Sequence, residues 1–159
     1  MNKYVPHVYV IPEDDRDRQI ADGFVLHHQV KVTRIKIMPP AGGWSKVLET
    51  FQNEYLQTLR DYPHGHVVLL IDFDDDIDRR RAKFAQAIPD DLESRVFVVG
   101  SKHNPETLKN ALSISYEAIG RSLASDCDDG TADHWNHEQL RHNDAERQRL
   151  VQIVRPFLF

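Results

Sequence analysis

The sequence predicts an α/β fold, because short apolar runs alternate with longer amphipathic stretches along the 159 residues. Four of the runs are rich in β-branched and aromatic side chains and are the expected strands, at residues 7–11, 30–38, 67–73 and 95–100. Strands that alternate with helices form parallel sheets through right-handed crossovers. We therefore expect one domain with a four-stranded, mostly parallel sheet and helices on both faces.

The segments between and after the strands carry apolar residues at helical spacing. They predict helices at residues 13–28, 45–62, 76–88, 104–124 and 137–155. The first begins with acidic side chains, which interact favourably with the positive N-terminal end of a helix. The fourth opens with Asn104 as the expected N-cap and Pro105 at the first helical position.

The last part of the chain is expected to form a helical extension. Residues 126–136 are polar and predict a loop, with Asn136 capping the terminal helix. Leucine, valine and isoleucine side chains between residues 140 and 154 dock that helix, and Pro156 is expected to break it. We divide the chain into an α/β domain, residues 1–125, and a loop and helix packed on the same domain, residues 126–159.

Net charge, cysteine content and the lengths of the apolar runs limit what kind of protein this is and where it is found. The formal net charge of −5 does not favour nucleic-acid binding by bulk electrostatics, so a metal or a basic partner must supply positive charge at any such site. The single cysteine, Cys127, leaves no disulfide within the chain and fits a reducing compartment. No signal-peptide pattern and no apolar run of about 18 residues is found, so we expect a cytoplasmic protein without a membrane span.

Acidic residues follow two of the predicted strands, at the ends where parallel α/β sheets bind ligands. Glu13 follows the first strand, and Asp72 and Asp74 follow the third, two positions apart and therefore on one face of an extended chain. If these strands are neighbours, the three carboxylates converge. Oxygen ligands without cysteine or clustered histidine suit Mg²⁺ or Mn²⁺, and Asp14 and Asp76 are further candidate ligands.

These residues resemble a known family. Glu at the end of the first strand, in "VYVIPEDD", and DxD at the end of a later one, in "LLIDFDDD", look like the Toprim fold, a Rossmann-like domain. The resemblance covers roughly residues 5–110. It implies that Glu13 acts as a general acid or base and that Asp72 and Asp74 hold Mg²⁺. Toprim sequences usually carry Gly after the Glu, where this chain has Asp14.

The segment "VGSKHNPETLK" after the fourth strand resembles the Toprim domain of the overcoming-lysogenization-defect (OLD) nucleases. The resemblance places Ser101, Lys102 and Glu106 at the same sheet edge, with Lys102 stabilising charge on a phosphate. It implies a metal-dependent nuclease acting on DNA or RNA, an effector of anti-phage defence that works with a partner ATPase or as a homo-oligomer.

Two other classes of function remain open. The acids after the first and third strands, with Lys102, also match a receiver-like signalling module that binds Mg²⁺. A catalytically silent subunit is the other alternative, with the apolar end "IVRPFLF" as its interface. The histidines of "DHWNHEQLRHN" fit an HNH nuclease poorly, because His137 and His142 are five residues apart and no strand pair precedes them.

Overall fold

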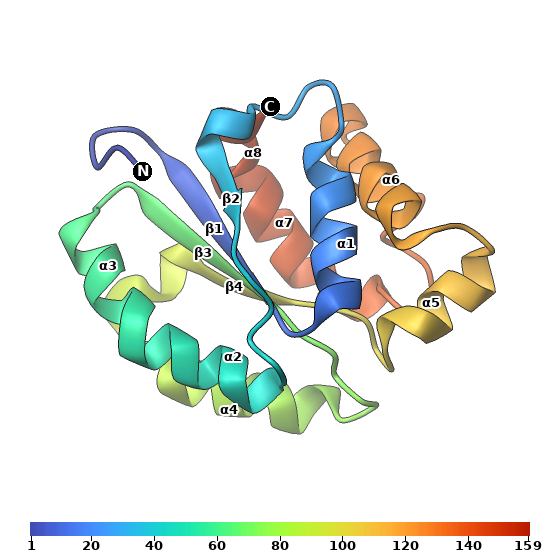
Figure 1. The fold of residues 1–159 in the computed structure, drawn as a ribbon, viewed down its shortest axis with the longest axis horizontal. Coiled ribbons are helices and arrows are strands. Elements are labelled where there is room, and N and C mark those ends of the chain that lie inside the picture. The colour runs from blue at the N-terminus through green and yellow to red at the C-terminus, as the bar shows by residue number, and fades with distance from the viewer.

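The computed structural model describes residues 1–159 and contains one sheet in which all neighbouring strands are parallel (Figure 1). The strands are β1 (His7–Pro12), β2 (Ile35–Ile37), β3 (Gly65–Leu70) and β4 (Val96–Val99), in the order β2-β1-β3-β4. The predicted α/β fold is confirmed. The first and third strands are central neighbours, which is the condition for their acidic ends to meet.

Each face of the sheet is covered by helices (Figure 1). One face packs against α2 (Trp44–Thr50), α3 (Leu56–Asp61) and α4 (Ile77–Ala87); a π-helical turn, Phe51–Tyr55, joins α2 to α3. The other face packs against α1 (Asp15–Val25), α7 (Asp144–Ile153) and α8 (Arg155–Leu158). Alternate side chains of β1 enter the two cores: Val8 and Val10 face α1, while Ile11 faces α2.

Helices α5 (Pro105–Leu112) and α6 (Tyr116–Asp129) form a further layer outside α1 (Figure 1). The backbones of α1 and α6 approach closely at two glycines. A Cβ on Gly120 would lie 1.8 Å from the carbonyl oxygen of Ile20, and one on Gly23 would lie 2.0 Å from that of Glu117. Any side chain at these two positions would collide with the backbone of the other helix. The two glycines therefore allow the close packing of α6 against α1.

The structure corrects several predicted boundaries. The strand expected at 30–38 is reduced to β2, because a short 3₁₀ helix, Val32–Arg34, precedes it. The helix expected at 104–124 is two helices, since Ser113 adopts a left-handed conformation, φ 54°, that ends α5. Residues 126–129 belong to α6 rather than to a loop. The terminal helix does end before Pro156, as expected: α7 ends at Ile153, and Pro156 lies in the first turn of a separate short helix, α8, where proline is tolerated.

The C-terminal segment is attached through a buried asparagine. Asn143 is fully buried, its amide nitrogen donates to the carbonyl of Gly100 at 2.9 Å, and its amide oxygen accepts from the Gly100 N–H at 3.1 Å. Asn136, the expected cap, lies in a turn before this point, and α7 begins at Asp144. Asn143 thus fixes the start of α7 against the residue that directly follows β4.

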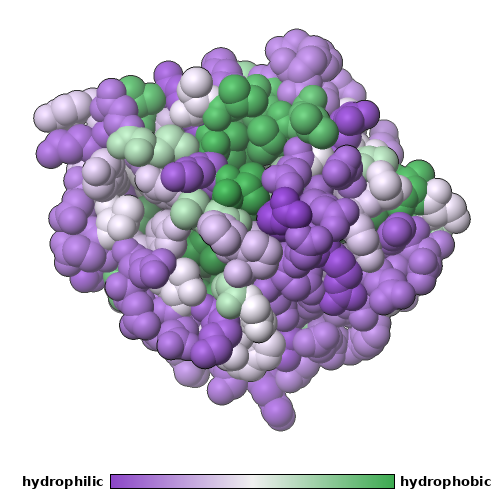
Figure 2. Space-filling view, viewed as in Figure 1, coloured by the Kyte–Doolittle hydropathy of each residue, from purple (hydrophilic) through white to green (hydrophobic).

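The surface is mainly hydrophilic in the view of Figure 2, and the most extensive gathering of hydrophobic side chains lies over the region where α1, β2 and α8 meet. No helix combines the length and the apolar composition that crossing a bilayer requires.

Candidate metal centre

Three carboxylates meet beyond the carboxyl ends of the two central strands. Glu13 directly follows β1, Asp72 lies beyond the end of β3, and Asp17 comes from the first turn of α1. All three are buried: Glu13 is 8% exposed, Asp17 1% and Asp72 4%. One oxygen from each lies within 4.8 Å of the others, so the three are close enough to coordinate a single ion. We call this group the carboxylate cluster.

Glu13 is held by the backbone on both sides. Its N–H donates to the Leu70 carbonyl at 2.9 Å, which continues the β1–β3 ladder by one residue. Its own carbonyl accepts from the N–H groups of Gly42 and Gly43 at 2.9 and 3.3 Å. Its carboxylate accepts the N–H of Asp72 at 2.6 Å. The backbone thereby fixes the side chain that joins the ends of the two central strands.

The helix that supplies Asp17 begins at Asp14. The Asp14 carboxylate caps α1 by accepting the N–H of Asp17 at 3.1 Å, and it also pairs with Arg16 at 2.8 Å. Asp14, a candidate ligand from the sequence, is therefore occupied as a helix cap. Asp17 is four residues after Glu13, and its buried carboxylate lies next to those of Glu13 and Asp72.

Two oxygens of the cluster have no hydrogen-bond partner. Asp17 Oδ2 and Asp72 Oδ1 are both fully buried and accept no hydrogen bond from an N–H group or a hydroxyl. In the metal-free protein, the Asp17 and Asp72 carboxyls hydrogen-bond to each other when one of them is protonated. Buried polar atoms without partners are uncommon and destabilising in folded proteins. A carboxylate oxygen that is buried, unpartnered and close to two more carboxylates is the donor arrangement that a divalent cation satisfies.

Burial and nearby negative charges raise the pKa of each member of the cluster. Burial is the largest cause in every case: it raises the pKa of Glu13 to about 7 and that of Asp72 to about 6. The pKa of Asp17 lies well above its ordinary value through burial and the nearby charge of Asp72. Without a cation, the cluster therefore retains protons at a pH where ordinary carboxyls have lost them.

One cation of the protein lies at the rim of the cluster. The Arg16 guanidinium is 3.7 Å from Asp72 Oδ2 and 3.7 Å from Glu106 Oε2, and about a third of its side chain is exposed. Glu106, the expected edge residue from α5, is largely exposed and reaches the cluster only through Arg16. Arg16 partly offsets the negative charge without filling the cluster itself.

Asp74 and Asp76 lie outside the cluster, contrary to the expectation from the DxD spacing. The chain does not stay extended after Asp72: Asp74 has φ 48°, which turns its carboxylate away to Arg80 at 2.7 Å. Asp76 is exposed and lies 3.8 Å from Arg79. The shared-face argument requires an extended backbone, and the left-handed turn at Asp74 removes that condition.

Ser101 and Lys102 follow β4 at the same sheet edge, with different surroundings. Ser101 is buried and its hydroxyl has no partner. Lys102 points to Glu138 at 3.9 Å, and its side chain is 40% exposed. The structure thus brings Glu13 and Asp72 together as expected, and it replaces Asp74 by Asp17 as the third carboxylate.

The sequence contained a signal for Asp17 that the strand-end argument did not use. Asp17 is four residues after Glu13, and an acid in the first helical turn after a strand returns toward the strand end. Comparison with known proteins adds no relative, because no protein-family model, no curated protein and no solved structure matches this chain.

Proposed function

We propose that the chain binds one divalent cation, Mg²⁺ or Mn²⁺, through Glu13, Asp17 and Asp72. The observation that carries the proposal is the pair of buried carboxylate oxygens without partners, within reach of a third carboxylate. The ligand set contains only hard oxygen donors, which Mg²⁺ and Mn²⁺ prefer over softer sites. The positive charge of the cation would stabilise the ionised form of these buried carboxylates.

The position of the cluster in the fold also supports this proposal. In open α/β sheets, ligands bind beyond the carboxyl ends of the strands where the strand order reverses, and in the order β2-β1-β3-β4 that point lies between β1 and β3. Glu13 and Asp72 are the residues at those two strand ends.

We further propose that the protein is a metal-dependent nuclease. The resemblance of "VYVIPEDD" and "LLIDFDDD" to Toprim domains supports this activity, with Asp17 taking the place expected for Asp74. A bound Mg²⁺ supplies Lewis-acid activation of a phosphodiester. The Toprim resemblance implies that Glu13 also manages a proton, and Arg16 at the rim is suited to bind a phosphate.

The net charge of −5 favours a partner in this role. A basic protein, such as the ATPase that the OLD resemblance implies, would supply the positive surface that holds nucleic acid near the site. The receiver-like alternative needs a lysine at the cluster. Lys102 instead faces Glu138, so that reading has less support.

Cleavage assays test the nuclease proposal. Supercoiled DNA, single-stranded DNA and structured RNA would be incubated with Mg²⁺ or Mn²⁺ and the protein or its Glu13→Gln, Asp17→Asn and Asp72→Asn variants. Loss of a metal ligand should reduce the cleavage rate by about 100-fold or more, since even outer-shell partners of metal ligands contribute 10- to 100-fold. Asp90→Asn, an exposed acid far from the cluster in the chain, is the matched control.

Cleavage that survives in all three variants would contradict the proposal. Metal binding without cleavage of any substrate would favour the signalling module or the silent subunit. The nuclease reading would then require that adding the partner ATPase restores metal-dependent cleavage.

A further inference from the structure

Ser101 carries a buried hydroxyl to which no group of the protein hydrogen-bonds. The residue follows β4 and is only 4% exposed, and its Oγ has no hydrogen-bond partner. Such a hydroxyl is uncommon in a folded protein, because it gives up its hydrogen bonds to water and gains none in return. A bound ion or water would supply the missing partner.

The strand pairing places Ser101 directly beside Asp72. Leu70 of β3 pairs with Val99 of β4. The pairing continues beyond the strands, because the N–H of Phe73 donates to the carbonyl of Ser101 at 3.0 Å. Asp72 and Ser101 each come two residues after the Leu70–Val99 pair, so they are neighbours across the two strand ends.

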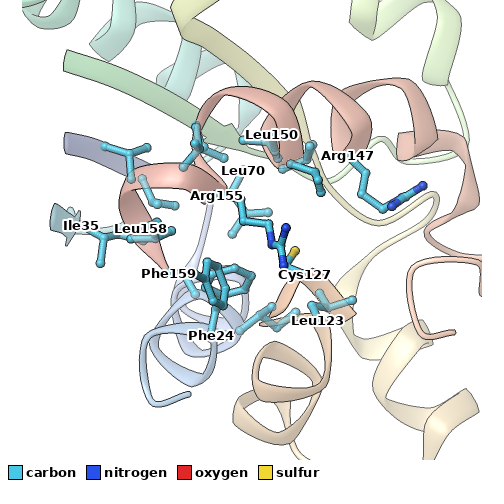
Figure 3. A pocket seen from close by; sticks show the side chains of 18 of the residues that line it. Phe24, Ile35, Leu70, Leu123, Cys127, Arg147, Leu150, Arg155, Leu158 and Phe159 are labelled. Atoms are coloured by element: carbon cyan, nitrogen blue, oxygen red, sulfur yellow. The ribbon is translucent and has the colours of Figure 1, made fainter. Parts of the chain in front are cut away.

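Both side chains lie on the face of the sheet that packs against α1. Leu70 and Val99 line an apolar hollow on this face, between the sheet, α1 and α7, and Figure 3 shows Leu70 there. Successive side chains of an extended strand alternate between the two faces, so the residues two positions further along return to the same face. Asp72 and Ser101 therefore point to the side from which α1 supplies Asp17.

The backbone of both segments remains extended as far as this pair. The N–H and carbonyl of Gly100 bond to Asn143 at the outer edge of the sheet, as expected where neighbouring residues of a strand direct these groups to opposite edges. Phe73, next to Asp72, packs in the core on the opposite face. The left-handed turn begins only at Asp74, so it does not affect this pair.

The two side chains are adjacent, yet they do not bind each other. Asp72 Oδ1 and Ser101 Oγ are both buried without a hydrogen-bond partner. The hydrogen bond that the Asp17 and Asp72 carboxyls share in the metal-free protein leaves the serine hydroxyl unpartnered. A divalent cation accepts a lone pair from each oxygen ligand, so it would satisfy the serine and the carboxylates together.

We propose that Ser101 is the fourth protein ligand of the cation at the carboxylate cluster, and that it binds through its neutral hydroxyl oxygen. This inference rests on the proposed metal site. It adds the end of β4 to the ends of β1 and β3 as a source of ligands. Mg²⁺ and Mn²⁺ prefer an octahedral set of oxygen ligands, so three carboxylates leave a position for it. Because the hydroxyl is uncharged, it adds no repulsion to the cluster.

Titration calorimetry of the full chain with Mn²⁺ tests the proposal. Ser101→Ala should bind Mn²⁺ about 10-fold or more weakly than the wild type, since even outer-shell partners of metal ligands contribute 10- to 100-fold. Ser122→Ala is the matched control. Ser122 is a partly buried serine of α6 whose hydroxyl already donates to the Ala118 carbonyl, at 2.9 Å, so its loss should leave Mn²⁺ affinity unchanged.

Thermal unfolding in EDTA gives a readout that separates a ligand from a merely structural serine. Ser101→Ala should have a Tm equal to or above that of the wild type, because it removes a buried hydroxyl that has no partner. Mg²⁺ should then raise the Tm of the variant less than that of the wild type, because the variant binds the ion more weakly.

Ser101→Cys distinguishes direct ligation from an effect transmitted through Asp72. A thiolate prefers soft cations, so the variant should bind Cd²⁺ more tightly than the wild type and Mg²⁺ more weakly. Cadmium on the new thiolate should also give an ultraviolet charge-transfer band. The wild type should lack this band, because its own thiol, Cys127, is buried among apolar side chains, and Ser122→Cys should show no gain in Cd²⁺ affinity.

Unchanged Mn²⁺ affinity in Ser101→Ala would overturn this proposal and leave the carboxylate site intact. A lower Tm of Ser101→Ala in EDTA, or a Ser101→Cys variant that gains neither Cd²⁺ affinity nor the new band, would also overturn it. Failure of the wild type to bind Mn²⁺ would reject the metal centre and this inference with it. Asp17→Asn tells the two failures apart, because it should lose binding wherever the cluster holds a metal, whatever Ser101 does.

Discussion

Replacing Glu13 by glutamine should stabilise the metal-free protein at alkaline pH. Glutamine keeps an oxygen that accepts the Asp72 N–H, but it removes one buried negative charge from the carboxylate cluster. The pKa of Glu13 rises from an ordinary 4.5 to about 7 on folding, chiefly through burial. Since one pKa unit corresponds to about 1.36 kcal/mol, ionising this side chain costs the fold about 3 kcal/mol.

The sign of the pH dependence follows from which state holds the proton. Between pH 4.5 and about 7 the folded protein keeps the Glu13 proton that the unfolded chain has released. Stability contributed by the neutral carboxyl is therefore complete below pH 4.5 and is lost as the pH rises through about 7. The Gln variant does not lose this stability as the pH rises. The free energies of unfolding of the two proteins should therefore differ little at low pH and most at pH 8.

Urea unfolding in EDTA at pH 5 and pH 8 measures the effect. Glu13→Gln should gain about 3 kcal/mol over the wild type at pH 8, equivalent to a Tm increase of about 6–12 °C for a chain of this size. Addition of Mg²⁺ should stabilise the wild type more than the variant. A variant that is equally destabilised at both pH values would refute the reasoning, since it would show that Glu13 acts through its hydrogen bond and not its charge.

Three other substitutions or treatments test the fold. Asn143→Ala should lower the free energy of unfolding in urea by about 2–4 kcal/mol, because it leaves the buried N–H of Gly100 without an acceptor and removes one of the two donors to the Gly100 carbonyl; an unchanged midpoint would contradict this. Gly120→Ala should lower Tm sharply, since its Cβ would meet the backbone of Ile20 at 1.8 Å, and an unaltered Tm would mean that α1 and α6 separate freely. Cys127, whose pKa burial raises to about 11, should react with a thiol reagent only in denaturant, and rapid native reaction would show local opening.

The sequence was most informative where the physics is local. Continuous apolar runs identified β1, β3 and β4, and the strand–helix alternation identified the parallel sheet. The convergence of Glu13 and Asp72 was predicted because each follows a strand and because β1 and β3 were assumed to be neighbours. The strand order confirms that assumption.

The errors arose where tertiary context or unusual backbone decides. The sequence around Asp74, a run of aspartates, does not indicate that Asp74 adopts a φ of 48°. Because of this turn, Asp74 lies outside the cluster, and Asp17 is its third carboxylate. Ser113 ends α5 in a left-handed conformation, and the apolar spacing of residues 104–124 does not indicate this break either.

Direct binding of Mn²⁺ tests the central claim, that the carboxylate cluster is a metal centre. Electron paramagnetic resonance of free Mn²⁺, titrated against the protein at pH 7.5, would count sites per chain. One saturable site should be found, displaced by Mg²⁺, weakened about 100-fold or more in Asp17→Asn and Asp72→Asn, and unchanged in Asp74→Asn. Absence of binding, or binding lost in Asp74→Asn but kept in Asp17→Asn, would contradict the account.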